Sequence, residues 1–195
     1  MARWAPDTRE RLRTAALELF DEQGFAATTV PDIVARAGLT KRTFFRHFSD
    51  KREVFFGDDE IPAIARHLLA SAPSDVPPMV LVSEGLRGLA AERFEPQRDR
   101  IRAARRVIEA EPALRERDLR KQADLRDSIE QGFTDRCDDA LTARVLGGVA
   151  VAWFKTALEA WLDDDTGAPL ADHLDTVLAR MRSVLGEPLM RSVLG

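Results

Sequence analysis

Apolar side chains recur at helical spacing along almost the whole chain of 195 residues, and this periodicity constrains the fold more than any other feature. No convincing stretch alternates apolar and polar residues with the period of two that marks a β-strand. Prolines and glycines separate the periodic segments, because proline interrupts a helix and glycine lets one end. The sequence therefore predicts an all-α protein of about nine helices.

Helix-start signals are clear in the first third of the chain. Thr29 and Thr40 suit the N-cap position, where a side-chain oxygen accepts a hydrogen bond from a backbone N–H group. Ser49 and Asp50 suit the cap of a longer fourth helix. The expected helices are 7–23, 30–37, 41–47 and 51–70, then, after a break at 71–78, 78–93, 97–110, 113–136, 139–163 and 168–185.

Positive charge is concentrated in one short segment of an acidic protein. The formal net charge is −4, yet residues 36–52 hold six cations and a single acid, Asp50. A compact basic patch on an acidic protein indicates a local contact with a polyanion, although a solvated basic face has the same composition.

Other features of the sequence argue against several classes of protein. No apolar run approaches the roughly 20 residues of a membrane span, and residues 1–13 lack the apolar segment of a signal peptide. The single cysteine, Cys137, fits a reducing cytoplasm, so we expect a cytoplasmic protein with no membrane partner. His67 and His173 are isolated, so we expect no metal and no cofactor. No catalytic motif is found, which predicts that the protein is not an enzyme.

The basic segment has the pattern of a helix-turn-helix, in which two short helices are joined by a brief turn that contains Gly38. Phe44 and Phe48 are four residues apart and share one helix face, which is expected to be buried together with Leu39. The opposite face is expected to be exposed and holds Lys41, Arg42, Phe45 and Arg46.

Residues 11–55 resemble the DNA-binding domain of the TetR family of transcriptional regulators, most clearly in ALELFDEQGFAATTVPDIVARAGLTKRTFFRHFSDKREVF. This stretch covers about a quarter of the chain. The resemblance implies a helix-turn-helix DNA-binding domain over 1–52 and an effector-binding and dimerisation domain over 53–186. Residues 187–195 are expected to form a tail, in which MRSVLG repeats an earlier stretch and is interpreted as a local duplication.

The resemblance also implies which residues contact DNA. In the family, the N-cap of the second helix, the recognition helix and a lysine at the start of the fourth helix make these contacts. The matching positions are Thr29, Thr40, Lys41, Arg42, Thr43, Phe45, Arg46, His47 and Lys51. Arg42 is expected to read guanine O6 and N7, with a phosphate contact as the alternative. His47 is expected to bind a phosphate rather than to act as a pH switch.

Two positions depart from the family pattern. The family often has a tyrosine where Phe45 stands, with its hydroxyl on a phosphate, but this chain has no tyrosine. Phe45 is able instead to contact a thymine methyl group or a sugar. Where Arg42 stands, a small residue, often glycine, is usual. The base preference therefore cannot be copied from relatives.

The larger domain is expected to form a homodimer and to bind a small hydrophobic effector. The sequence RTFFRHF, followed by GDDE, resembles more loosely a subgroup of the family that is associated with acyl-CoA-like ligands. Candidate effector residues, for which a place in the plain core is the alternative, are Ile64, Leu68, Val82, Leu86, Ile108, Phe133, Phe154 and Leu158. Gly147 and Gly148 would let another helix approach closely. Candidate dimer residues, with the same alternative, are Val145, Gly148, Ala152, Trp153, Trp161, Leu174 and Leu178.

Together these features predict a ligand-responsive transcriptional regulator. We expect a dimeric repressor that binds a pseudo-palindromic operator in double-stranded DNA and is released by its effector. A dimer places its half-sites roughly 34–36 Å apart, or at a multiple of that spacing. The alternative is a DNA-packing protein that binds with little sequence preference and does not respond to an effector.

Overall fold

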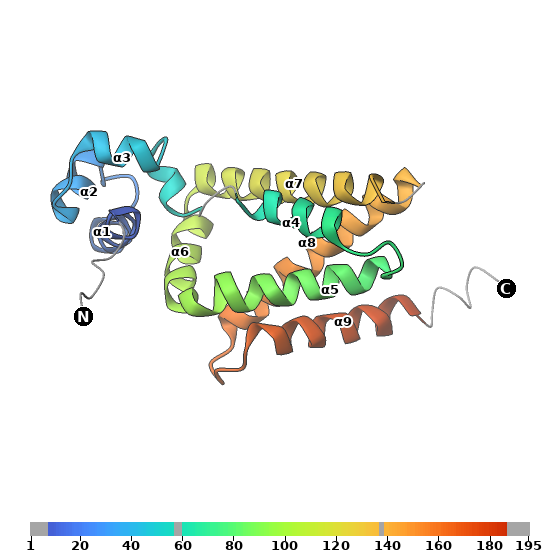
Figure 1. The fold of residues 1–195 in the computed structure, drawn as a ribbon. Helices are drawn as coiled ribbons and strands as arrows, with labels where there is room; N and C mark the ends of the chain where they lie inside the picture. Colours follow the sequence, from blue (N-terminus) through green and yellow to red (C-terminus); the bar gives the residue numbers. More distant parts are fainter. Residues whose placement is uncertain (1–7, 57–59, 137–138, 187–195) are drawn as a thin grey trace, which may run out of the picture. The chain divides into compact units, whose positions relative to one another are not determined.

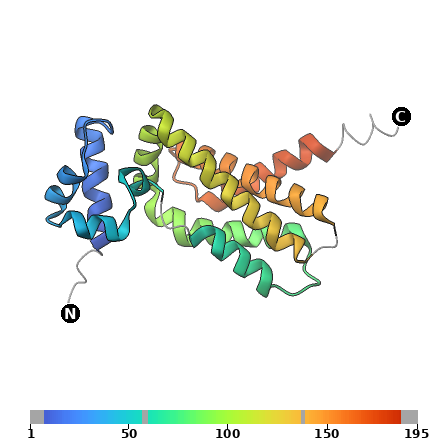
Figure 2. The ribbon, with the colours of Figure 1, turned by 90° about the horizontal axis from the view of Figure 1, so that it is seen from above.

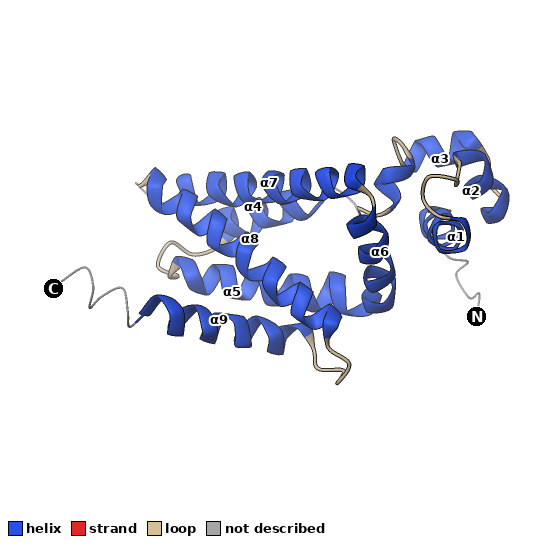
Figure 3. Ribbon diagram, turned by 180° about the vertical axis from the view of Figure 1, so that it is seen from behind, coloured by secondary structure: helices blue, strands red, loops and turns tan. Residues whose placement is uncertain are grey.

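The computed structural model describes residues 8–56, 60–136 and 139–186. Every regular element in these residues is helical, as Figure 3 shows, so the all-α prediction is confirmed. Residue contacts divide the chain into two compact units, the first being Met1–Asp58 with Arg102–Leu119 and the second Asp59–Ile101 with Arg120–Gly195. The sequence-based domain boundaries stay a prediction, and they did not foresee that Arg102–Leu119 joins the N-terminal segment.

The first unit is built on α1 (Thr8–Gln23), α2 (Val30–Ala37) and α3 (Lys41–His47), which are drawn in shades of blue in Figure 1. One apolar face of α1 is buried and consists of Leu12, Ala15, Ala16, Leu19 and Phe20. The apolar faces of α2 and α3 pack into the same core. Asp7, the predicted start of the first helix, lies outside the described residues.

Residues from the junction of α6 (Arg98–Ala110) and α7 (Pro112–Thr134) complete this core. Leu114 is fully buried among the side chains of the N-terminal helices. Arg117 forms an ion pair with Glu53 at 2.5 Å. The helix-turn-helix is therefore held by a segment that follows it by about fifty residues in the sequence.

The predicted fourth helix over 51–70 is wrong as a single element. Asp50 does act as a cap, but it caps only one turn of 3-10 helix, η1 (Lys51–Val54), and α4 begins at Glu60. Val54 is fully buried, and the ring of Phe55 stacks on that of Phe20 at 4.8 Å between centroids. These two adjacent side chains anchor the segment to α1, and the chain then turns at Phe55 and bends at Phe56.

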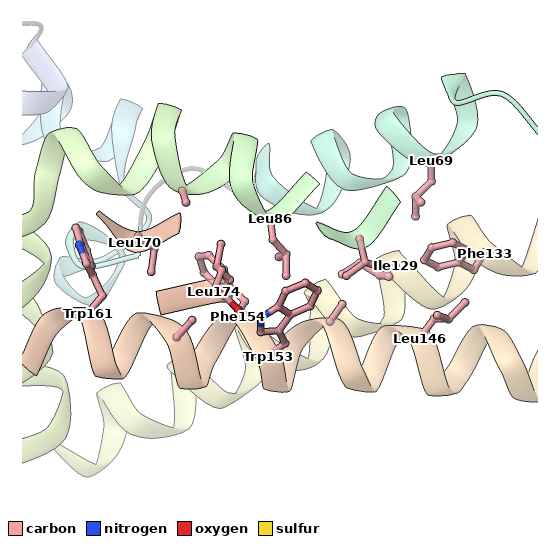
Figure 4. Packing of buried hydrophobic residues seen from close by; sticks show 14 of the residues in the cluster. Leu69, Leu86, Ile129, Phe133, Leu146, Trp153, Phe154, Trp161, Leu170 and Leu174 are labelled. Atoms are coloured by element: carbon pink, nitrogen blue, oxygen red, sulfur yellow. Dashed lines mark hydrogen bonds between the residues drawn. The ribbon is translucent and has the colours of Figure 1, made fainter. Parts of the chain in front are cut away.

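The second unit contains α4 (Glu60–Ser71), α5 (Pro78–Leu89), α8 (Ala140–Asp163) and α9 (Leu170–Gly186), with the neighbouring parts of α6 and α7. After α5 the helix widens into a π turn, Ala90–Phe94, before Pro96 interrupts it. Figure 2 shows these helices from above. Figure 4 shows side chains of this core, to which α8 contributes the large rings of Trp153, Phe154 and Trp161.

Two glycines allow helices of the second unit to pack closely. A Cβ atom at Gly147 would lie 2.9 Å from the carbonyl oxygen of Arg126 in α7. A Cβ atom at Gly132 would lie 2.7 Å from the Leu69 side chain of α4. Arg136 then closes the end of α4 by donating to the carbonyl oxygens of Leu69, Ala72 and Pro73 at 2.6–2.8 Å. These contacts tie both α4 and α8 to α7.

By length and composition α8 is apolar enough to cross a membrane, with a mean hydropathy of 1.3 in its most apolar window. However, 44% of that window is buried inside the chain. Trp153 donates its indole N–H to the carbonyl oxygen of Leu174 in α9 at 2.8 Å. These contacts are those of a core helix in a helical bundle.

Candidate nucleic-acid interface

The turn between α2 and α3 has the geometry of a helix-turn-helix. Gly38 ends α2 in the left-handed conformation, with φ of 64°, and its N–H donates to the carbonyl oxygen of Ala35. Arg11 closes the same end from α1 by donating to the carbonyl oxygen of Ala37 at 2.7 Å. Thr40 caps α3, as predicted, by accepting the Thr43 N–H at 3.2 Å. Backbone conformation and capping together hold α3 in place on α1 and α2.

The start of α2 is closed by a complete capping box. Thr29 accepts the Asp32 N–H, and it donates both its own N–H, at 2.8 Å, and its hydroxyl, at 2.6 Å, to the Asp32 carboxylate. The hydroxyl and N–H of Thr29 lower the pKa of the Asp32 carboxyl. The phosphate contact expected of Thr29 stays a prediction, but both of its donors point to Asp32 here.

Lys51 was expected to bind a phosphate, but the structure gives its ammonium group an internal role. It donates to the carbonyl oxygens of Phe25 at 2.7 Å and Thr28 at 2.8 Å. It also lies 4.3 Å from the centroid of the Phe25 ring. Lys51 thus holds the loop that leads into α2, a role that the helix-start pattern did not reveal because the partners are carbonyl groups distant in sequence.

Internal contacts use half of the cations in the basic segment. Arg36 pairs with Glu22 at 2.6 Å and with Glu18 at 3.4 Å, and its pKa is raised mainly by the Glu22 hydrogen bond. Arg52 pairs with Asp50 at 3.4 Å, and Lys51 holds the loop. The remaining three cations, Lys41, Arg42 and Arg46, all belong to α3, and none of them forms an ion pair within the described residues.

The predicted division of the α3 aromatics is confirmed. Phe44 and Phe48 are buried, at 0% and 2% exposure, whereas Phe45 is 56% exposed. Leu39 is partly buried and packs against the same core. The exposed face of α3 therefore combines positive charge with one aromatic ring, and Thr43 and His47 lie half-buried at its margin.

A separate apolar cavity lies within the second unit, between α4, α5, α7 and α8. The cavity has a volume of about 70 Å³. On the same scale one water molecule needs roughly 10–15 Å³, so the cavity is several times larger than a site for a single water. Its lining is apolar throughout and consists of Ile61, Ile64, Ala65, Leu68, Leu69, Leu81, Val82, Gly85, Leu86, Leu89, Leu125, Ile129, Phe133 and Ala150.

The cavity brings together five of the predicted effector residues, namely Ile64, Leu68, Val82, Leu86 and Phe133. The other three do not line it. Ile108 packs in the core of the first unit, because α6 leaves the second unit after Ile101. Phe154 packs edge-on against Phe94 at 4.9 Å between centroids, and Leu158 packs against the core of the second unit. The sequence missed Leu125 and Ile129, two lining residues from α7, whose apolar positions are sparse among charged residues.

The predicted dimer residues fall into two groups. The side chains of Trp153, Trp161 and Leu174 are buried in the core of this chain, at 0–2% exposure, which supports the core alternative for them. Leu178 is half-buried beside that core. The outward positions on α8 are Val145, Gly148 and Ala152, to which the structure adds the exposed Leu141.

The fold and the exposed face of α3 define a helix-turn-helix protein with a larger helical domain. Comparison with known families matches residues 12–57 to the bacterial regulatory proteins of the TetR family and residues 76–186 to the MftR C-terminal domain. The second match alone covers more than half of the chain. The protein therefore belongs to the TetR family of transcriptional regulators, and the resemblance to this family is confirmed.

Relatives and solved structures agree with this assignment. The regulator TcmR of Streptomyces glaucescens is 28% identical over 166 residues, which cover 79% of this chain and 73% of TcmR. The mycofactocin biosynthesis regulator MftR of Mycobacterium tuberculosis is 29% identical over 167 residues, or 82% of each chain. A regulator from Pseudomonas aeruginosa shares the fold, with a TM-score of 0.62, 15% identity, and coverage of 97% of this chain and 96% of its own. These relatives are transcriptional regulators, which are not enzymes.

Proposed function

We propose that this protein is a repressor that binds a specific operator in double-stranded DNA through α3. The observation that carries this proposal is the exposed face of α3, which holds Lys41, Arg42 and Arg46 in a protein of net charge −4. Cations that no carboxylate neutralises attract phosphates and release counterions on binding. In a helix-turn-helix the second helix enters the major groove, which is the place of α3 in this fold.

Within this interface we assign base reading to Arg42. It is the second residue of α3, and the N-terminal residues of a recognition helix contact base edges. A guanidinium group binds guanine O6 and N7 through two parallel hydrogen bonds. Lys41 and Arg46 are then phosphate contacts, which orient the helix but carry no sequence information.

The effector proposed is a small apolar molecule that occupies the cavity of the second unit. The lining offers no charged or hydrogen-bonding side chain, so burial of a polar group there would be unfavourable. A hydrocarbon chain suits such a lining. Of an acyl-CoA-like ligand, only the acyl part would fit this cavity. The effector would release DNA by binding more tightly to a conformation that does not fit the operator.

A second copy of this chain is the partner proposed for α8. Leu141, Val145, Gly148 and Ala152 follow one another at intervals of four, three and four residues, so they share one helix face. Leu141 is 67% exposed and Val145 is 54% exposed, and a Cβ at Gly148 would meet nothing within 4 Å. Burying this stripe against its own copy would favour a homodimer. The variant Val145→Glu should then sediment as a monomer.

We assign the protein to the cytoplasm, where a regulator meets DNA.

The alternative function is that of a DNA-packing protein with little sequence preference. Such a protein would also use the positive charge of α3, but it needs neither the cavity nor a base-reading arginine. Selection of bound duplexes from a random DNA library separates the two. A regulator should enrich one palindromic motif, whereas equal recovery of all sequences would contradict the repressor proposal.

A further inference from the structure

All ten phenylalanines of this chain lie among the described residues, and Phe45 is the one that is exposed. A single exposed apolar side chain is common on protein surfaces and needs no special cause. The position of Phe45 is what distinguishes it. It lies on α3 three residues after Arg42 and one before Arg46, so the three side chains occupy the same exposed helix face.

The Phe45 ring is also held in a defined orientation. Its centroid is 5.4 Å from that of Phe44, and the two rings meet edge to face at 84°. Phe44 is fully buried and lies 5.4 Å from the ring of the buried Phe48. An aromatic pair of this kind adds to the stability of the arrangement. One side of Phe45 thus contacts a core ring while much of the side chain faces solvent.

We propose that Phe45 is a specificity-determining residue that reads a thymine through the 5-methyl group of the base. This inference rests on the proposed function of α3 as the recognition helix. In the major groove the thymine methyl is the apolar feature of the base edges, and phenylalanine is one of the side chains that contact it. Without a hydroxyl group, Phe45 has nothing to donate to a phosphate.

The same ring also selects against other bases. At guanine or adenine, Phe45 would cover the N7 acceptor and leave it without water or a partner, and at cytosine the methyl contact would be missing. Discrimination therefore has an attractive part, the methyl contact, and a repulsive part, the covered polar edge. Arg42 supplies the polar reading beside it, so the two side chains together specify a guanine near a thymine.

The test uses duplexes enriched from a random library by the full-length protein. Each thymine of the enriched motif is replaced in turn by deoxyuridine, which lacks only the methyl group and keeps the same hydrogen-bonding atoms. At one thymine position in each half-site the affinity should fall roughly fourfold, the effect of losing one buried methyl group. At the other thymine positions the affinity should not change.

Two variants link this effect to the side chain. With Phe45→Ala, thymine and uracil duplexes should bind equally well, because the methyl group has lost its contact. With Phe45→Leu, which keeps an apolar side chain, the preference for thymine should persist. Both variants lose the ring contact with Phe44, so their DNA affinities are compared well below their melting temperatures.

The outcomes distinguish a failure of the proposed regulatory function from a failure of thymine reading by Phe45. If no motif is enriched, the proposed regulatory function fails. If a motif is enriched but uracil has no effect at any position, or has the same effect in wild type and Phe45→Ala, the reading of thymine by Phe45 is overturned.

Discussion

The ammonium group of Lys51 donates a hydrogen bond to the carbonyl oxygen of Thr28 at 2.8 Å, directly before the residue that caps α2. Thr28 is itself fully buried, and its hydroxyl donates to the carbonyl oxygen of Gly24 at 2.9 Å. Lys51 therefore joins η1 to the loop that fixes the start of α2. The DNA contact expected of Lys51 stays a prediction, while its ammonium group has hydrogen-bond partners within the domain.

We predict that Lys51→Met lowers the free energy of unfolding by roughly 1–3 kcal/mol, because buried carbonyl groups lose a charged donor. The slope of log affinity against log salt concentration should stay as in the wild type. Urea unfolding and DNA titrations at several salt concentrations measure the two quantities.

Lys41→Met is the matched control, because Lys41 is exposed on α3 and forms no ion pair in the described part of the chain. It should leave stability unchanged and reduce the salt slope by about one. If Lys51→Met reduced the slope as much as Lys41→Met does, Lys51 would be a phosphate contact after all.

Adjacent glycines of α8 should respond oppositely to alanine. Gly147→Ala places a methyl group 2.9 Å from the Arg126 carbonyl oxygen and should cost about 1–3 kcal/mol of stability. In the Val145→Glu background, where this face of α8 is not covered by a second copy, Gly148→Ala meets nothing within 4 Å and should gain up to about 1 kcal/mol from helix propensity. Thermal unfolding compares them, and equal shifts would mean that α7 does not approach Gly147 so closely.

The capping box predicts a pH dependence. Hydrogen bonds from Thr29 lower the pKa of Asp32 in the folded state. The contribution of the Asp32 carboxylate to stability is therefore fully present above the unfolded pKa of about 3.9. It is lost as the pH falls through the lower pKa of the folded state. The stability difference between wild type and Asp32→Asn should shrink over that range. A pH-independent difference for Asp32→Asn would contradict the prediction.

Two glycines of α5 allow a test of the cavity. A Cβ atom would meet nothing within 4 Å at either Gly85 or Gly88, but only Gly85 is among the lining residues. Gly85→Leu should fill part of the cavity and weaken binding of the neutral apolar dye N-phenyl-1-naphthylamine by about tenfold, or ~1.4 kcal/mol. Gly88→Leu should bind the dye as the wild type does. Fluorescence titration measures both, and equal losses would place the dye elsewhere.

Local signals in the sequence were sufficient for the helix-turn-helix. The spacing of Phe44, Phe45 and Phe48 on one helix separates buried rings from the exposed one, and Thr29 and Thr40 mark helix starts by chemistry that acts within three residues. These features depend on neighbours in the sequence, which is why they could be predicted and are found in the structure.

Long-range contacts could not be predicted in the same way. The burial of Leu114 in the core of the first unit and the ion pair between Glu53 and Arg117 join residues that are sixty or more positions apart. Trp153 and Trp161 have the same apolar pattern whether they face their own core or a partner, so periodicity alone could not place them. The role of Lys51 was missed because backbone carbonyl groups, its partners, leave no mark in the sequence.

Specific DNA binding through Arg42 is tested most directly by titrating an enriched duplex and a scrambled duplex at about 0.15 M salt. We predict that the wild type binds the enriched duplex at least about 10³-fold more tightly. Arg42→Ala should lose roughly 1–3 kcal/mol on the enriched duplex and little on the scrambled one. Equal affinity of the wild type for both duplexes would contradict sequence-specific regulation.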